Sequence, residues 1–130
     1  MNEQIKQYLL QWKQKANEDL LTIKRLSDGE MTATSSICFH CQQLVKKYLK
    51  LFLLYHAVDI ARTHEIEFLL HECSKIDNDF NTIDPKNLSD FGVAIRYPDD
   101  FYLPSEEETK EYILLAIAIK NMVEQRIDLK

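Results

Sequence analysis

The sequence predicts an all-α protein, an up-and-down bundle of about five helices in a single domain over residues 1–130. Long segments repeat apolar residues every three or four positions and are rich in Leu, Lys, Gln and Glu, which favour helices. Only 2 glycines and 3 prolines interrupt these segments. A chain of 130 residues can bury roughly two-thirds of its unfolded surface as one domain.

The first two predicted helices are the longest. The first runs from about Glu3 to Leu26, and Ser27, Asp28 and Gly29 end it. The second covers about Ser35 to Tyr55. Its last turns, from Leu51 to Tyr55, are apolar on nearly every side, which indicates a helix that is central in the bundle or shared with a second chain.

Two shorter helices are predicted next. Thr63 is the expected N-cap of the third, with acidic residues close behind it. The side chains expected to face inward are Ile66, Leu69, Leu70 and Cys73. Asp84 followed by Pro85 indicates the start of a fourth, short helix that reaches Ile95 and cannot continue through Pro98.

A capping box from Ser105 to Glu108 marks the start of the fifth helix, which extends to about Val123. The segment from Tyr97 to Pro104 that precedes it holds two prolines, two aspartates and aromatic residues. Such a composition is more typical of a functional loop with a defined shape than of a simple linker.

The net charge of −5 is distributed unevenly. Residues 1–62 carry +3 and residues 63–130 carry −8. This acidic balance argues against nonspecific binding of a long nucleic acid, although Lys46, Lys47 and Lys50 could form a local basic surface or a solvated helix face. No apolar stretch approaches the roughly 20 residues of a membrane span and the N-terminus does not resemble a signal peptide. We therefore expect a soluble, cytoplasmic protein.

The cysteines and histidines offer few catalytic arrangements. Cys38 and Cys41 have metal-ligand spacing, but on a helix they share the apolar face, so we expect buried, reduced thiols and no metal site. The histidines are His40, His56, His64 and His71. No nucleophile motif or glycine-rich phosphate loop accompanies them, and no cofactor is predicted. His64 stands out because it lies at a predicted helix start close to Arg62.

Three segments together resemble the HEPN domain family. They are Phe39 to Lys50 (FHCQQLVKKYLK), Arg62 to Leu70 (RTHEIEFLL) and Arg96 to Asp99 (RYPD), and Trp12, Ala16, Asp19 and Leu20 also fit its first helix. The resemblance implies a four-helix core with a short extra helix, usually a homodimer. In bacterial members it also implies a possible partner, a minimal nucleotidyltransferase.

Nucleases of this family cut RNA without a metal. They use an arginine followed by a histidine, and the two copies of this motif, one from each subunit, meet across the dimer axis. Arg96 matches the arginine, but positions 101 to 103 hold Phe101, Tyr102 and Leu103, so the histidine is absent. Loss of a positioned acid or base typically costs about 10²- to 10⁴-fold in rate.

The leading hypothesis is therefore a dimer, non-nucleolytic or weakened as a nuclease, that binds a nucleotide, an RNA phosphate or a partner nucleotidyltransferase. Its expected ligand-binding residues are Arg96, Tyr97, Asp99, Asp100, Tyr102 and His64. The alternatives are an RNA endonuclease toxin of a toxin–antitoxin pair, using Arg96 and a histidine from position 64 or 40, and a protein-interaction scaffold. Arg96 could also simply pair with Asp99 or Asp100.

Overall fold

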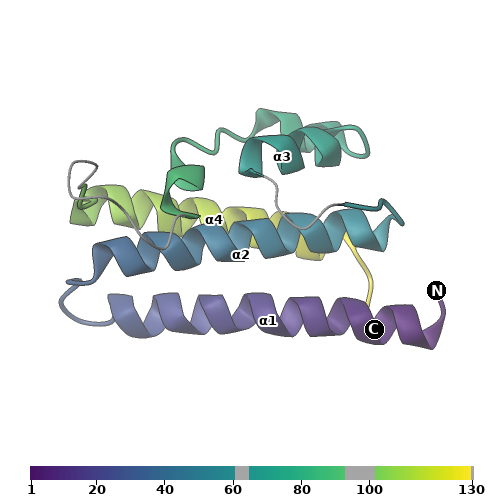
Figure 1. Cartoon of the computed structure of the whole chain (residues 1–130), viewed down its shortest axis with the longest axis horizontal. Coiled ribbons are helices and arrows are strands. Elements are labelled where there is room, and N and C mark those ends of the chain that lie inside the picture. Colours follow the sequence, from purple (N-terminus) through teal and green to yellow (C-terminus); the bar gives the residue numbers. More distant parts are fainter. Residues whose placement is uncertain (61–64, 93–101, 130) are drawn as a thin grey trace.

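The computed structural model describes residues 1–60, 65–92 and 102–129, and these ranges form an all-α fold (Figure 1). The α-helices are α1 (Glu3–Ser27), α2 (Thr34–Tyr55), α3 (Ile66–Ser74) and α4 (Glu106–Arg126). Two 3-10 helices, η1 (Asn78–Thr82) and η2 (Leu88–Gly92), lie between α3 and α4 in the sequence. The class is as predicted.

Local sequence accounts for the starts of α1 and α4. The side chain of Asn2 accepts a hydrogen bond from the Ile5 backbone N–H at 2.8 Å. At α4 the Ser105 hydroxyl accepts from the Glu108 N–H at 3.0 Å, and the Glu108 carboxylate accepts from the Ser105 N–H at 3.2 Å. The predicted capping box is therefore confirmed.

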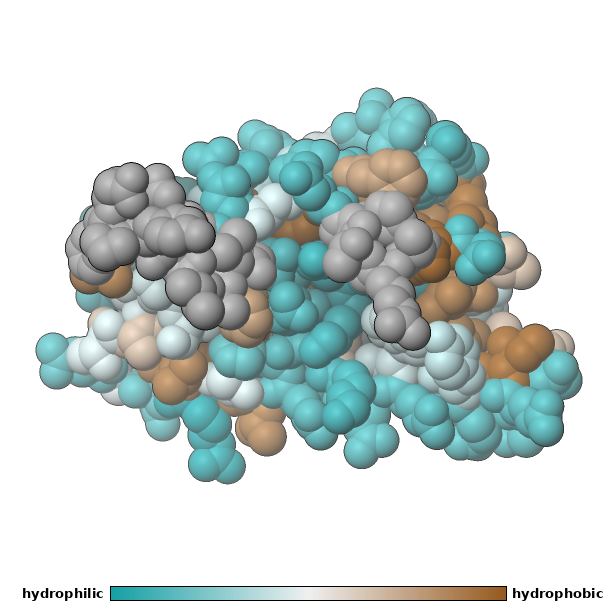
Figure 2. Space-filling view, in the orientation of Figure 1, coloured by the Kyte–Doolittle hydropathy of each residue, from teal (hydrophilic) through white to brown (hydrophobic). Residues whose placement is uncertain are grey.

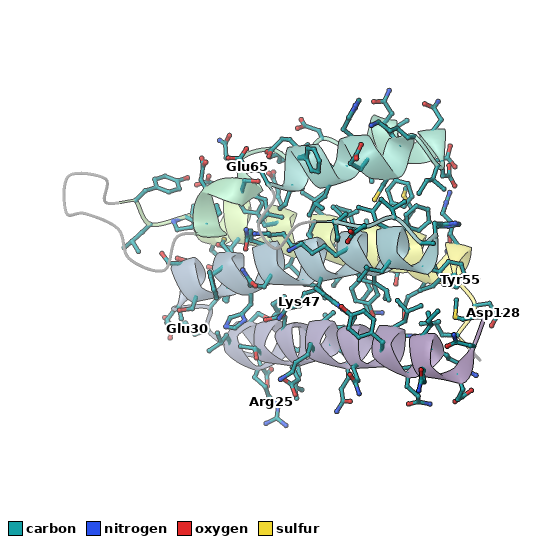
Figure 3. All side chains as sticks on the ribbon, turned by 45° about the vertical axis from the view of Figure 1, so that its right-hand side comes forward. Arg25, Glu30, Lys47, Tyr55, Glu65 and Asp128 are labelled. Carbon is teal, nitrogen blue, oxygen red and sulfur yellow. The ribbon has the colours of Figure 1, made fainter. Side chains whose placement is uncertain are left out.

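The centre of the bundle is α2, which packs against α1, α3, η2 and α4. Leu51, Phe52 and Leu53 are no more than 1% exposed, and the Phe52 ring lies 4.7 Å from that of Phe80. The Tyr55 hydroxyl accepts a hydrogen bond from the Asp128 N–H at 3.3 Å, and Figure 3 shows the two residues together at one end of the molecule. Of the two interpretations of the apolar end of α2, a central helix is the one observed.

The direction of α4 differs from a simple up-and-down order. In Figure 1, α1 runs antiparallel to α2, whereas α4 runs in the same direction as α2. Contacts at two levels agree: Cys38 lies against Thr109, and Tyr48 lies beneath Lys120. The direction follows from the path after α3, because the chain returns along the bundle from α3 to η2 (Figure 1).

The segment around Pro85 does not begin an α-helix, so the predicted start of the fourth helix is wrong. Lys86 has a φ of 54°, in the left-handed region, and its N–H donates to the Asp84 carboxylate at 2.9 Å. Asp84 thus closes a turn instead of capping a helix. A 3-10 helix, η2, begins only at Leu88. Ile95 and Pro98 lie outside the described residues.

The predicted N-cap of α3 is also wrong. The N-cap position is Glu65, whose side chain makes no capping bond, and Thr63 lies outside the described residues. The Ser89 hydroxyl of η2 instead accepts the Ile66 N–H at 3.1 Å. A helix start that lacks a local cap is thus completed from a distant part of the chain. The residues predicted to face inward on α3 are all buried, which confirms that part of the prediction.

The face shown in Figure 2 is mostly hydrophilic along α1 at its lower edge, and hydrophobic side chains gather toward the right. Within the described ranges, no helix combines the length and the apolar character that crossing a membrane requires.

Candidate functional site

Of the six predicted ligand-binding residues, the structure describes one, Tyr102. The other five are Arg96, Tyr97, Asp99, Asp100 and His64, and they lie outside the described residues. Tyr102 is 50% exposed and stands at the end of the segment that carries Arg96, just before α4. The candidate site is therefore built here from Tyr102 and the residues that hold it.

The Tyr102 hydroxyl donates a hydrogen bond to Oε2 of Glu108, in the first turn of α4. This bond raises the pKa of Tyr102 to about 12 and lowers the pKa of Glu108 below its ordinary value. The same carboxylate accepts the Ser105 N–H through Oε1, so both of its oxygens are used. Tyr102 is thus held by a cap residue of α4 and keeps its proton at neutral pH.

Beneath Tyr102 lies an aromatic group. The Phe91 ring is 6.4 Å from the Tyr102 ring and 5.4 Å from the Tyr112 ring, in an edge-on arrangement with the latter. Phe91 and Tyr112 are 7% and 5% exposed, so they form a fixed apolar support under the half-exposed phenol. These ring contacts connect η2, which precedes the Arg96 segment in the sequence, to α4, which follows it.

The surroundings of Tyr102 are acidic. The first turn of α4 contains Glu106, Glu107 and Glu108, and Lys86 is paired with Glu111 at 2.9 Å. These carboxylates complement the positive end of the α4 dipole. They also oppose a ligand with a long run of negative charges, because each phosphate would add repulsion.

A second polar cluster lies between α1 and α2, and sequence reasoning did not predict it. Asp19 is 7% exposed, and its two oxygens contact His40 Nδ1 at 2.8 Å and Lys47 Nζ at 2.6 Å. Figure 3 shows Lys47 on the side of α2 that faces α1. One signal was available: Asp19 interrupts the apolar stripe of α1 between Ala16 and Ile23.

The lysines considered as a local basic surface have separate environments. Lys47 is turned toward Asp19, and Lys50 is 8% exposed, with its pKa lowered by burial and by Lys46 nearby. The three side chains therefore do not form a single solvated basic face. Among the histidines, His40 pairs with Asp19, whereas His56 and His71 are exposed.

The cysteines behave as expected for packed thiols. Cys38, Cys41 and Cys73 are all buried and unpaired with one another. Burial raises the pKa of each thiol, to about 12 for Cys73. Within residues 1–60, 65–92 and 102–129, no group of side chains has the composition and spacing to hold a metal ion.

A family model for the HEPN domain matches residues 9–126. Searches of curated proteins and of solved structures found no match. The matched range extends from α1 to the last residue of α4 and includes both polar groups described above. Over nearly its whole length, from the buried Leu9 to the final turn of α4, the chain belongs to the HEPN domain family.

Proposed function

We propose that this protein is a non-nucleolytic HEPN protein that binds a nucleotide through Arg96 and acts as a homodimer in the cytoplasm. A guanidinium can bind phosphate through two parallel hydrogen bonds, and Tyr97 or Tyr102 can stack on a base. HEPN domains often dimerise, and the family membership of the chain supports this part of the proposal.

The absence of a histidine after Arg96 is the observation on which the loss of nuclease activity rests, and the pairing of Tyr102 with Glu108 supports it. No histidine occurs at positions 101 to 103, so Tyr102 is the only side chain there with an exchangeable proton. Because its pKa is raised to about 12, it holds this proton far above neutral pH. A group that cannot release or regain a proton near pH 7 is a poor general acid–base catalyst.

The acidic first turn of α4 favours a compact phosphate ligand over a long RNA. Affinity for a long nucleic acid comes mainly from neutralising many phosphates. Residues 63–130 carry −8, and the first turn of α4 holds three glutamates, of which Glu108 is bonded to Tyr102. A nucleotide needs only one cationic side chain to bind its phosphate, and Arg96 can supply it.

The test is a titration of the purified protein with a fluorescently labelled adenine nucleotide. Loss of a charge-assisted hydrogen-bonded contact is worth roughly 1.5–3 kcal/mol, so Arg96→Ala is expected to weaken binding by about 10- to 100-fold. Arg25→Ala is the matched control, because Arg25 is exposed on α1 and points away from the bundle (Figure 3). Equal binding by the wild type and Arg96→Ala, or no binding by either, would refute the proposal.

A short RNA and a co-expressed minimal nucleotidyltransferase serve as competing ligands in the same experiment. Binding of the RNA in preference to the nucleotide would assign the Arg96 site to RNA phosphate. Arg96-dependent binding of the partner enzyme alone would assign it to a protein interface.

The retained Arg96 keeps an RNA endonuclease toxin as the second candidate. That function requires a histidine from elsewhere, and His40 is already paired with Asp19. Expression of the chain alone distinguishes the two: we expect normal growth and intact cellular RNA. Growth arrest with RNA cleavage that Arg96→Ala abolishes would establish the nuclease instead.

A further inference from the structure

A small pocket opens between α3 and η1, which pack against each other. Figure 1 and Figure 3 both show α3 on the opposite side of α2 from α1. The α3–η1 pocket has a volume of about 170 Å³ and is open to solvent. The apolar part of its lining consists of Leu70, Phe80, Ile83 and Pro85. The pocket is therefore a small apolar hollow at the surface.

The apolar part of the pocket is held in place by α4. Phe80 is 0% exposed and Leu70 is 6% exposed. Arg126, in the last turn of α4, donates to Asp77 at 2.6 Å and to Asp79 at 2.7 Å, and these two carboxylates stand at the start of η1. The pocket is thus formed before any ligand arrives, so little has to be ordered on binding.

The volume of the pocket limits the size of its ligand. Pockets for nucleotides and drug-sized molecules typically measure about 300–1,000 Å³. An enclosed cavity of about 150 Å³ in another protein holds one benzene molecule. At about 170 Å³, the α3–η1 pocket has room for a group of the size of one amino-acid side chain.

The surroundings of the pocket are acidic. Residues 65–92 contain seven acidic and two basic side chains, which gives this range a net charge of −5. The two basic residues are Lys75 and Lys86, and each is already paired with a glutamate outside the pocket lining, Glu72 and Glu111 respectively. The local field therefore repels an anionic ligand and attracts a cationic one.

Glu67 is the acidic side chain in the pocket lining, where it is accompanied by His71 and Asn81. Its Oε2 accepts a hydrogen bond from the Ser89 hydroxyl at 2.9 Å, and within the described ranges no lysine or arginine pairs with it. The amide oxygen of Asn81 is a second acceptor. Two acceptors beside an apolar surface suit a ligand that has several N–H donors on an apolar stem.

We propose that the α3–η1 pocket binds a single arginine side chain from a basic segment of a partner protein. The guanidinium group donates to the Glu67 carboxylate and to the Asn81 amide oxygen, and the methylene groups of the stem lie on the apolar part of the lining. Arginine is favoured over lysine because a planar guanidinium is more weakly hydrated than an ammonium, so it leaves water more readily. This interaction is independent of the proposed nucleotide binding.

The first test is an NMR titration of the isotopically labelled full chain with a short glycine–serine peptide that carries one central arginine. We expect saturable shifts of the His71 and Asn81 amide signals. Citrulline in place of the peptide's arginine keeps nearly the same shape but has no charge, and is expected to weaken binding by about tenfold. A peptide with lysine at this position is expected to bind more weakly than the arginine peptide.

The second test removes the charge of Glu67. Glu67→Gln retains an oxygen that can accept from Ser89, and is expected to weaken binding of the arginine peptide by about tenfold. Glu65→Gln is the matched control, because Glu65 is an exposed residue at the same end of α3 and does not line the pocket (Figure 3). It removes the same charge and is expected to change the affinity by less than about twofold. Circular dichroism checks that both variants remain helical.

The third test fills the pocket with a cation of the chain itself. Asn81→Lys places an ammonium group beside Glu67 and is expected to weaken peptide binding by at least about tenfold, because like charges then compete for one site. Asn78→Lys is the control, since Asn78 is exposed on the same 3-10 helix, lies outside the lining and receives the same charge.

Several outcomes would overturn the arginine site. These are unchanged His71 and Asn81 signals, equal binding of the arginine and citrulline peptides, and equal binding of the arginine and lysine peptides. Equal weakening by Glu67→Gln and Glu65→Gln would also overturn it, because the overall negative charge would then attract the peptide without the pocket. Arg96→Ala is expected to leave the affinity for the peptide unchanged, so the result is separate from the test of nucleotide binding.

Discussion

Replacing Asp19 with asparagine tests whether the polar cluster between α1 and α2 stabilises the fold. The amide keeps the shape of the carboxylate but removes the negative charge that faces His40 and Lys47. Losing one partner of a buried ion pair costs roughly 3–5 kcal/mol, whereas exposed pairs contribute about 0.2–1 kcal/mol.

The exposure of the three side chains places the effect between these limits. The Asp19 side chain is 9% exposed, but those of His40 and Lys47 are 28% and 27% exposed and regain water when the carboxylate is lost. We therefore expect Asp19→Asn to lower the free energy of unfolding by about 2 kcal/mol. For a domain of this size, that loss corresponds to a Tm lower by roughly 6–10 °C.

The assay is urea unfolding followed by circular dichroism, in a cycle of Asp19→Asn, Lys47→Met and the double variant. Direct coupling predicts that the two effects are not additive and differ from their sum by about 1 kcal/mol. Glu18→Gln is the control, because Glu18 is the exposed neighbour of Asp19 on α1. A loss below roughly 0.5 kcal/mol, or additive effects, would show that the cluster does not hold the helices together.

Three further changes test other contacts. Leu53→Ala is expected to lower the free energy of unfolding by about 2–5 kcal/mol, as measured by urea unfolding, whereas Leu103→Ala, on an exposed side chain, is expected to change it by less than about 0.5 kcal/mol. Ser105→Ala is expected to cost about 0.5–2 kcal/mol in the same assay through loss of the capping box, and an unchanged midpoint would contradict that role. Arg126→Ala is expected to lower the thermal midpoint at neutral pH, because Arg126 contacts Asp77 at 2.6 Å. The Asp79 backbone N–H and then Arg126 lower the pKa of Asp77 below 3.8, so this stabilisation is present at neutral pH and is lost as the pH falls below that value. A difference between wild type and Arg126→Ala that stays constant below pH 3.8 would contradict the assignment.

The parts of the fold that the sequence predicted depend on local signals. The start of α4 follows from Ser105 and Glu108, which lie within one turn, and the bounds of α1 and α2 follow from their long apolar periodicity. The two wrong helix starts occur where a contact from a distant part of the chain, or the backbone angle of one residue, determines the local structure. Lys86 adopts a positive φ that few residue types favour, so Asp84 and Pro85 gave a misleading helix start.

At the candidate site, too, the sequence predicts local features but not contacts between side chains. The missing histidine could be read directly from positions 101 to 103, but the bond from Tyr102 to Glu108 could not. The capping-box pattern predicts the bond from the Ser105 N–H to one oxygen of Glu108, but nothing in the sequence predicts that its other oxygen accepts from Tyr102. The sequence marks Asp19 only as a match to the first helix of the family, because its partners lie 21 and 28 residues further along the chain.

The Ser89 hydroxyl couples two segments that the sequence separates by 23 residues. It accepts the Ile66 N–H and donates to the Glu67 carboxylate at 2.9 Å, so the first turn of α3 is completed only while η2 stays docked. Displacement of η2, which directly precedes the Arg96 segment, would therefore remove both hydrogen bonds from the first turn of α3. The exchange rate of the Ile66 amide with deuterium thus reports on whether η2 is in place.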